Sequence, residues 1–386
     1  MTVTFPAGFR AAGVPAGIKS SGKPDLALVV NDGPHYAAAG VFTRNKLAAA
    51  PVLWSRQVLT AGRLRAVVLN SGGANACTGP QGFQTTHATA ECAAEVLGCG
   101  AAEIAVCSTG LIGAQLPRDT VLSGVNSAAD ALSATEQAAT DAATAVLTTD
   151  THAKQARYRD EAGWRIGGFA KGAGMIAPAM ATMLSVLTTD AVVAGPDLDA
   201  ALRAASALTF ERLDIDGSTS TNDTVLLLAS GASGVPVDRT ALTDALVTVC
   251  TELVDQLQAD AEGVTKHVTI TARGAASERD ALTVARGVAR DSLVKTAFFG
   301  SDGNWGRIVM AVGNADAVID PHALDITVNG VTLCRAGEAV GGRDTADLSG
   351  RDITVDIELG VGESVAEVRT TDLSHGYVEE NSAYPS

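Results

Sequence analysis

The sequence predicts a mixed α/β fold, arranged as one large unit or as two domains. Alanine-rich segments whose apolar residues recur every three or four positions alternate with short runs of β-branched residues, which is typical of helices and strands in one chain. With 386 residues, of which 46% are hydrophobic, the chain can bury a substantial core. Because the βαβ order is irregular, sheets packed between helix layers fit as well as a doubly wound sheet. We expect two layered halves.

Short apolar runs predict the strands, and apolar residues at helical spacing predict the helices. The strand candidates are residues 26–30, 66–69, 104–106, 225–228 and 268–271, followed by an alternating, half-buried run at Ile353, Val355, Ile357 and Leu359. Residues 118–147 predict one or two helices. A stripe of apolar side chains predicts another at Leu242, Leu246, Val249, Leu253 and Leu257. Ser277 with Asp280 resembles a capping box, which predicts a helix start there.

The charge balance limits the classes of partner. The formal net charge is −15 and the isoelectric point is near 4.8, whereas nucleic acids and anionic membranes require a basic face. We therefore expect a small-molecule substrate and no nucleic-acid or membrane partner. No apolar run reaches the roughly 18 residues of a spanning helix, and the N-terminus lacks a signal-peptide pattern, which predicts a cytoplasmic location. The six cysteines show no CxxC spacing, so we expect reduced thiols and no metal site.

Two short motifs resemble ligand-binding loops but lack required residues. Gly17, Gly22 and Lys23 match most of a phosphate-binding loop, yet Pro24 occupies the position of the magnesium-binding hydroxyl. A turn is the better interpretation. The DIDG run at residues 214–217 lacks the third acidic position of a calcium loop. The polar cluster at residues 214–224 is therefore either a hydrogen-bonded turn or a segment that shapes a site.

A glycine-bearing turn follows the predicted strand 104–106. Thr109 and Gly110 in this turn could hold an oxyanion through a hydroxyl and a backbone N–H, although such turns are commonly structural. A second turn at residues 70–75 is similar, and a structural role is favoured for it.

The strip at residues 171–184, KGAGMIAPAMATML, places Thr182 in an otherwise apolar, glycine-bearing setting. Composition alone favours a buried threonine whose hydroxyl bonds to a carbonyl. The alternative is a nucleophile that self-cleavage exposes. Attack of the Thr182 hydroxyl on the carbonyl of Ala181 gives an ester that water hydrolyses, and the new α-amine then serves as the base.

These segments resemble a known family over essentially the whole chain. The matching motifs are AGIK (16–19), VFTRN (41–45), NSGGANACTG (70–79), CSTGLIG (107–113), the strip 171–184, DIDGSTSTND (214–223), LQADAEGVTK (257–266), FGSDGNWGR (299–307) and ENSAYPS (380–386). The chain resembles the ornithine acetyltransferases, the bifunctional glutamate N-acetyltransferase/amino-acid acetyltransferases of arginine biosynthesis, and is most similar to their actinobacterial members.

The resemblance implies a precursor that cuts itself into an α chain (1–181) and a β chain (182–386), with cleavage between Ala181 and Thr182. It makes Thr182 the catalytic nucleophile and gives Thr109 and Gly110 the oxyanion hole. The substrate contacts that it implies are Thr148, Lys171, Thr182, Glu262, Asn381 and Ser386.

The implied reaction is a ping-pong transfer of the acetyl group from N2-acetyl-L-ornithine to L-glutamate, with no cofactor and with acetyl-CoA as a possible co-substrate. The implied fold is a sandwich of helix, sheet, sheet and helix layers, assembled as an α2β2 heterotetramer. Two alternatives stay open. A related self-processing aminopeptidase would transfer the acyl group to water, and a non-catalytic binding protein would leave Thr182 uncut.

Overall fold

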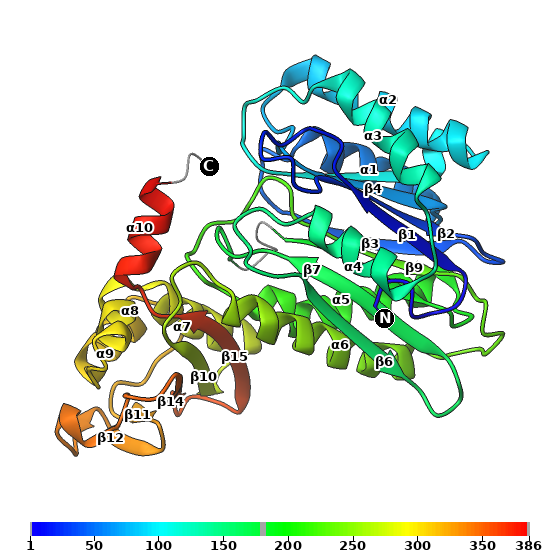
Figure 1. Ribbon diagram of the computed structural model, residues 1–386. Helices are drawn as coiled ribbons and strands as arrows, with labels where there is room; N and C mark the ends of the chain where they lie inside the picture. Colours follow the sequence, from blue (N-terminus) through cyan, green and yellow to red (C-terminus); the bar gives the residue numbers. More distant parts are fainter. Residues whose placement is uncertain (1, 178–182, 384–386) are drawn as a thin grey trace. The chain divides into compact units, whose positions relative to one another are not determined.

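The computed structural model describes residues 2–177 and 183–383. The predicted cleavage pair, Ala181 and Thr182, and the predicted substrate contact Ser386 lie outside the described residues. The chain forms two compact units (Figure 1). The first contains Met1–Glu211 and Thr219–Leu257, and the second contains Arg212–Ser218 and Gln258–Pro385.

A four-stranded sheet of the first unit, among the residues described, has the order β1-β2-β4-β5. Its strands are β1 (Phe9–Val14), β2 (Leu26–Asn31), β4 (Ala66–Ser71) and β5 (Ile104–Thr109). The first three run antiparallel, whereas β4 and β5 are parallel, with Ser71 opposite Thr109. One face packs against α2 (Gly79–Leu97) and α3 (Arg118–Asp130), and α1 (Ala50–Val58) lies beside β5. Helices therefore cover the outer face of this sheet (Figure 1).

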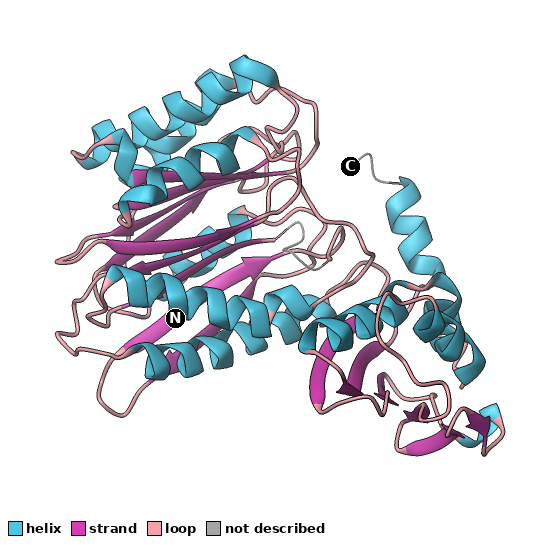
Figure 2. Ribbon diagram, turned by 180° about the vertical axis from the view of Figure 1, so that it is seen from behind, coloured by secondary structure: helices cyan, strands magenta, loops and turns pink. Residues whose placement is uncertain are grey.

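A five-stranded sheet faces the first one, and its described strands have the order β3-β9-β8-β7-β6. These are β3 (Ala37–Phe42), β9 (Thr224–Ala229), β8 (Leu184–Thr189), β7 (Arg165–Lys171) and β6 (Lys154–Arg159). Helices α5 (Gly195–Leu208) and α6 (Arg239–Ala259) lie on its side away from the first sheet (Figures 1 and 2). Strands β7 and β8 are antiparallel neighbours with Lys171 opposite Leu184, so the predicted cleavage position falls in the connection between two paired strands.

A shared apolar core joins the two sheets. It combines inward side chains of both, such as Val29 and Leu228, with the alanines of α4 (Glu136–Ala145). Helix α4 lies against β1, where a Cβ atom at Gly13 would fall 2.0 Å from the Asp141 carbonyl oxygen. Glycine is thus required for this close approach. The first unit has the predicted layers of helix, sheet, sheet and helix (Figure 2).

The second unit is a further α/β body with its own core. Among its described residues, the sheet order is β13-β12-β11-β14-β10-β15. The strands are β10 (His267–Ala275), β11 (Asp325–Val328), β12 (Val331–Arg335), β13 (Glu338–Ala339), β14 (Asp352–Glu358) and β15 (Ser364–Thr371). Its helices are α7 (Glu278–Arg290), α8 (Ser292–Phe299), α9 (Trp305–Gly313) and α10 (His375–Ala383). Helix α7 packs on β10 and β15 through buried residues such as Val284 and Val288.

The elements predicted from sequence are confirmed. The first five strand runs fall within β2, β4, β5, β9 and β10, and the alternating run lies on β14 except for Leu359, which follows the end of that strand. The predicted helical segment 118–147 divides into α3 and α4. The leucine and valine stripe lies on α6, and the Ser277 hydroxyl accepts a hydrogen bond from the Asp280 N–H at 3.1 Å at the start of α7. Residues 15–23 form no helix or strand, as predicted for a turn. Among the helices that the structure describes, none is both long and apolar enough to cross a membrane.

Candidate active site

Lys171 contacts two side chains that lie far from it in the sequence. It ends β7, and its side chain is fully buried. Its Nζ donates to the Oγ1 of Thr109 at 2.9 Å and to the Oγ1 of Thr148 at 3.0 Å. Thr109 ends β5 of the facing sheet, and Thr148 follows α4. The packing of the two sheets thus gathers three of the predicted site residues at one point.

Burial and neighbouring charges set the protonation of Lys171. Burial lowers the pKa of its ammonium group to about 8, and this is opposed by the negative charge of Asp150 and reinforced by the positive charge of Lys154. The side chain is therefore mostly charged at neutral pH. It can donate hydrogen bonds to both threonines and attract a carboxylate or a developing negative charge.

The Thr109 hydroxyl is poised to act as a donor. Its oxygen already accepts from the Lys171 ammonium, and in the part of the chain that the structure describes no acceptor is paired with its hydrogen. A hydroxyl that accepts from a cation is polarised as a donor. Gly110 follows with φ +127°, a conformation in which a Cβ atom would lie 2.8 Å from the backbone nitrogen of Gly73. This position needs glycine, and the turn can offer a hydroxyl and a backbone N–H to an oxyanion.

Asn222, from the polar cluster at residues 214–224, holds this turn in place through hydrogen bonds. Asn222 is buried, and its Nδ2 donates to the carbonyl oxygens of Ala74 at 2.6 Å and Ser108 at 2.8 Å. The loop after β4 runs beside the turn, with the N–H of Gly73 donating to the Thr109 carbonyl at 3.1 Å. Residues 214–224 were predicted to be either a hydrogen-bonded turn or a segment that shapes a site. The hydrogen bonds of Asn222 agree with both alternatives, because they hold the backbone of the candidate site.

Sequence reasoning missed the buried ion pair beside Lys171. The Oδ1 of Asp150 accepts from the Nζ of Lys154 at 2.6 Å, and both side chains are fully buried. Its Oδ2 accepts from the N–H of Thr148 at 3.2 Å. Burial alone would raise the pKa of the Asp150 carboxyl, but the charges of Lys171 and Lys154 hold it below its usual value. The sequence did contain a signal for this pair, because Asp150 lies two positions after Thr148 and Lys154 lies four positions after Asp150.

A second missed carboxyl anchors the chain next to the predicted nucleophile. The Oδ1 of Asp223 accepts from the N–H of Met183 at 3.1 Å, and the N–H of Thr224 donates to the Met183 carbonyl at 3.0 Å. Asp223 is fully buried, and burial raises the pKa of its carboxyl well above the usual value. The residue that follows Thr182 in the chain is therefore held on both its N–H and its carbonyl.

Two further predicted substrate residues pair with each other in the second unit. The Nδ2 of Asn381, on α10, donates to the Oε2 of Glu262 at 2.9 Å and to the Tyr377 carbonyl at 3.0 Å. Helix α10 approaches the chain closely here, since a Cβ atom at Gly263 would lie 2.0 Å from the Tyr377 nitrogen. Glu262 is half-buried, and Asn381 is exposed.

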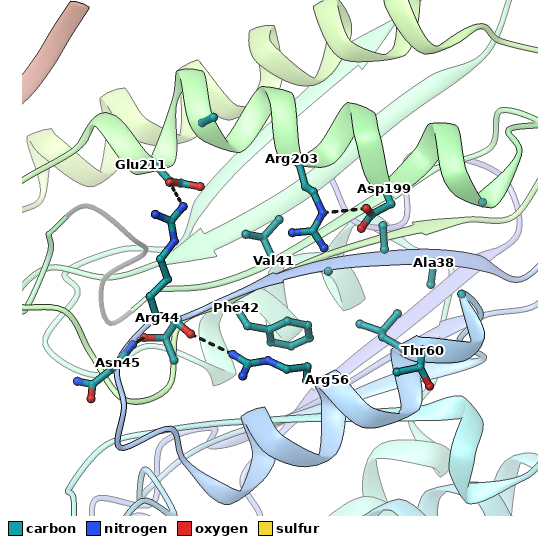
Figure 3. A pocket seen from close by; sticks show the side chains of 17 residues that line it. Ala38, Val41, Phe42, Arg44, Asn45, Arg56, Thr60, Asp199, Arg203 and Glu211 are labelled. Carbon is teal, nitrogen blue, oxygen red and sulfur yellow. Dashed lines mark hydrogen bonds and ion pairs between the residues drawn. The ribbon is translucent and has the colours of Figure 1, made fainter. Parts of the chain in front are cut away.

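The first unit also contains a cavity of about 830 Å³ (Figure 3). It is bordered by β3, α5 and the end of α1, and it includes the VFTRN motif. Its arginines are already engaged, because Arg44 pairs with Glu211 at 2.8 Å and Arg203 with Asp199 at 2.8 Å. Of the predicted site residues that the structure describes, none lines this cavity. Across residues 2–177 and 183–383, no cluster of three or more His, Cys, Asp or Glu side chains is arranged to hold a metal ion.

The profile of the ArgJ family matches residues 10–386. The chain belongs to the ArgJ family. The Arginine biosynthesis bifunctional protein ArgJ of Mycolicibacterium paratuberculosis is 61% identical to this ArgJ-family chain, over 100% of this chain and 96% of the relative. The protein of the same name from Streptomyces coelicolor is 54% identical, over the full length of both chains. The family predicted from the sequence motifs, with its similarity to actinobacterial members, is confirmed.

Two solved structures also match this ArgJ-family chain. The ornithine acetyltransferase of Mycobacterium tuberculosis complexed with ornithine is 60% identical, covering 47% of this chain and 96% of that chain, with a TM-score of 0.46. The arginine biosynthesis bifunctional protein ArgJ of Bacillus halodurans is 32% identical, covering 51% of this chain and 97% of that chain, with a TM-score of 0.49.

Proposed function

We propose that this protein transfers the acetyl group of N2-acetyl-L-ornithine to L-glutamate, with Thr182 as the acetyl-carrying nucleophile. The observation that carries this proposal is the convergence of Lys171, Thr109 and Thr148 in a chain of the ArgJ family. The relatives' name, Arginine biosynthesis bifunctional protein, agrees with it.

The nucleophile becomes available by self-cleavage. The Thr182 hydroxyl attacks the carbonyl carbon of Ala181, the peptide C–N bond breaks, and the nitrogen takes up the proton as the α-amine of Thr182. Water then hydrolyses the resulting ester, which frees the carboxylate of Ala181 and restores the hydroxyl. The products are an α chain of residues 1–181 and a β chain of residues 182–386.

The transfer then proceeds in two half-reactions. The α-amine of Thr182 accepts the hydroxyl proton as the oxygen attacks the acetyl carbonyl, and the proton passes to the departing α-nitrogen of ornithine when the C–N bond breaks. The amine of glutamate next attacks the acetyl-threonine ester. A C–N bond forms between the acetyl carbon and the glutamate nitrogen, and the C–O bond of the ester breaks. The Thr182 oxygen takes up the proton that the glutamate amine releases.

The other predicted residues supply charge and orientation. Thr109 and Gly110 donate to the oxyanion of each tetrahedral intermediate. Lys171 and Thr148 hold the substrate carboxylate, whereas Glu262 pairs with the side-chain ammonium of ornithine. Asn381, already hydrogen-bonded to Glu262, and Ser386 complete the substrate contacts.

The proposal extends to a second donor and to the assembly. Acetyl-CoA can serve the same acetyl-threonine chemistry, because a thioester also acylates a hydroxyl. We further propose that the α and β chains remain together as a cytoplasmic α2β2 heterotetramer. Incubating the enzyme with acetyl-CoA and glutamate tests the second activity, and the mass of the native complex tests the assembly.

Intact mass combined with a transfer assay tests the main proposal. We expect two chains that end and begin at Ala181 and Thr182, and one uncut chain for Thr182→Ala. The wild-type protein should form N-acetylglutamate from acetylornithine and glutamate, and Thr182→Ala should not. An active wild-type enzyme of full-length mass would refute the role of Thr182 as a nucleophile exposed by cleavage. Release of free acetate or N-terminal amino acids without acetylglutamate would favour the hydrolase alternative.

A further inference from the structure

Asp150 connects the backbone at two of the substrate residues. Its Oδ2 accepts from the N–H of Thr148 at 3.2 Å. Its Oδ1 accepts at 2.6 Å from the N–H of Gly172, the residue after Lys171. The carboxylate is fully buried, so water does not compete for these bonds. One side chain thus ties the position of Thr148 to that of Lys171.

Asp150 also provides negative charge to two buried ammonium groups. Lys154 and Lys171 are both 0% exposed. The pairing of β6 with β7 puts Lys154 opposite Ala170, the residue before Lys171, and the positive charge of Lys154 acts on Lys171. Two buried ammonium groups repel each other, and each has lost its hydration, so a nearby carboxylate is needed to offset both costs.

The other charged groups around Lys171 do not replace Asp150. Lys154 and Lys19 are positive and disfavour its charge, and the acidic groups with the largest effects on it in the described part of the chain are Asp150 and Asp223. Burial raises the pKa of Asp223 well above its usual value, which favours its neutral form. Asp150 instead stays ionised, since the neighbouring lysines hold its pKa low.

We propose that Asp150 is a positioning residue that keeps Lys171 in its ammonium form and aligned with Thr109 and Thr148 for binding of the substrate carboxylate. This inference rests on the proposed function, in which Lys171 holds that carboxylate. Asp150 itself contacts the backbone and Lys154 rather than the reacting atoms.

Asp150→Asn removes the charge and keeps the size. The Oδ1 of the asparagine can still accept from Gly172 and Lys154, whereas its Nδ2 faces the N–H of Thr148, so one hydrogen bond is also lost. The lost bond lowers activity equally at every pH. The lost charge lowers activity only where Lys171 becomes neutral, and the two effects separate in a pH profile.

The measurement is kcat/KM for acetylornithine between pH 6 and pH 9.5 with processed enzyme. For the wild type we expect a fall above pH 8, because the pKa of Lys171 is about 8. In Asp150→Asn the fall begins at least about one pH unit lower, since a neighbouring opposite charge commonly shifts a pKa by 1–3 units. The ratio of wild-type to variant activity then rises by about tenfold between low and high pH. Lys154→Met removes a positive charge instead and should move the fall to higher pH.

Asp190→Asn is the matched control. Asp190 is a buried carboxylate that accepts two backbone N–H bonds, from Ala7 at 3.0 Å and from Arg165 at 2.7 Å, and it does not act on Lys171 or on Lys19. The ratio of wild-type kcat/KM to that of this control variant should not change with pH. A constant ratio for Asp150→Asn, or a wild-type profile flat up to pH 9.5, overturns the inference. Failure of the proposed function is distinct, because the wild type would then form no acetylglutamate at any pH.

Discussion

Replacing Thr109 with valine tests whether its hydroxyl stabilises the oxyanion. Valine has nearly the same shape, so the change removes the hydroxyl from a fully packed position, where Thr109 is 1% exposed. Two interactions disappear together. Lys171 loses one of the two hydroxyl oxygens to which it donates, and the proposed oxyanion loses a polarised donor.

The two losses affect different quantities: the lost oxyanion donor lowers kcat, and the lost hydrogen bond to Lys171 lowers the free energy of unfolding. Removal of one oxyanion donor lowers kcat by about 10²–10³, or about 2.7–4 kcal/mol. Both half-reactions pass through a tetrahedral intermediate, so both should slow. The lost bond to a charged group lowers the free energy of unfolding by about 1.5–3 kcal/mol. The variant should therefore be both slower and less stable, with little change in KM.

Thr148→Val and Thr109→Ser are the controls for this prediction. The hydroxyl of Thr148 is the other acceptor for Lys171 but is proposed to touch the substrate rather than the oxyanion. Its loss should raise KM more than it lowers kcat. Serine at position 109 retains the hydroxyl and should recover most of kcat.

The assay follows acetylglutamate formation by mass spectrometry at saturating acetylornithine and glutamate. Intact mass is measured first, so that only cut enzyme is compared, and urea denaturation reports the free energy of unfolding. A processed Thr109→Val enzyme with kcat within about threefold of the wild type would refute the reasoning, since it is far below the effect of a lost oxyanion donor. Thr109 would then be structural.

Two further substitutions probe the framework of the site. Gly110→Ala should lower stability by about 1–3 kcal/mol and disrupt turnover, because its φ is +127° and the new methyl group would meet the Gly73 backbone at 2.8 Å. Gly113→Ala is the control, because Gly113 also has a positive φ (+87°) but a Cβ atom there would meet nothing within 4 Å; equal effects of the two changes in urea denaturation would contradict the steric argument. Lys154→Met should lower the free energy of unfolding by about 3–5 kcal/mol, since it leaves the buried Asp150 without that partner; a loss no larger than that of the exposed Lys23→Met would contradict it.

The strands were predictable because their signal is local, although their ends were not. The run at residues 104–106 predicted a strand that continues in the structure to Thr109. Its last residues are small or polar, so the apolar run that predicted the strand stops before them. Pairing with β4 extends it, with Ser108 opposite Asn70 and Thr109 opposite Ser71. The backbone of a neighbouring strand thus decided where this one ends.

The site residues were predictable only as motifs. Thr109 came first from the glycine-bearing turn after a predicted strand, whereas Thr148 and Lys171 came from the family resemblance. Nothing in their spacing indicated that one ammonium group bonds to both hydroxyls. Asp150 and Lys154 escaped notice because a charged pair four residues apart is ordinarily an exposed pair of modest effect. Their burial follows from the packing of β6 and β7 within the first unit.

By itself the sequence determined the α/β class, the main elements and the family, because periodicity and long motifs are properties of the chain in order. Tertiary structure alone decided which of these motifs meet. The facing of two sheets sets Lys171 beside Thr109, and hydrogen bonds from Thr148, Gly172 and Lys154 hold Asp150 close to Lys171. The tertiary structure also decides the protonation state of Lys171, because its pKa depends on how far burial outweighs the attraction of neighbouring charges.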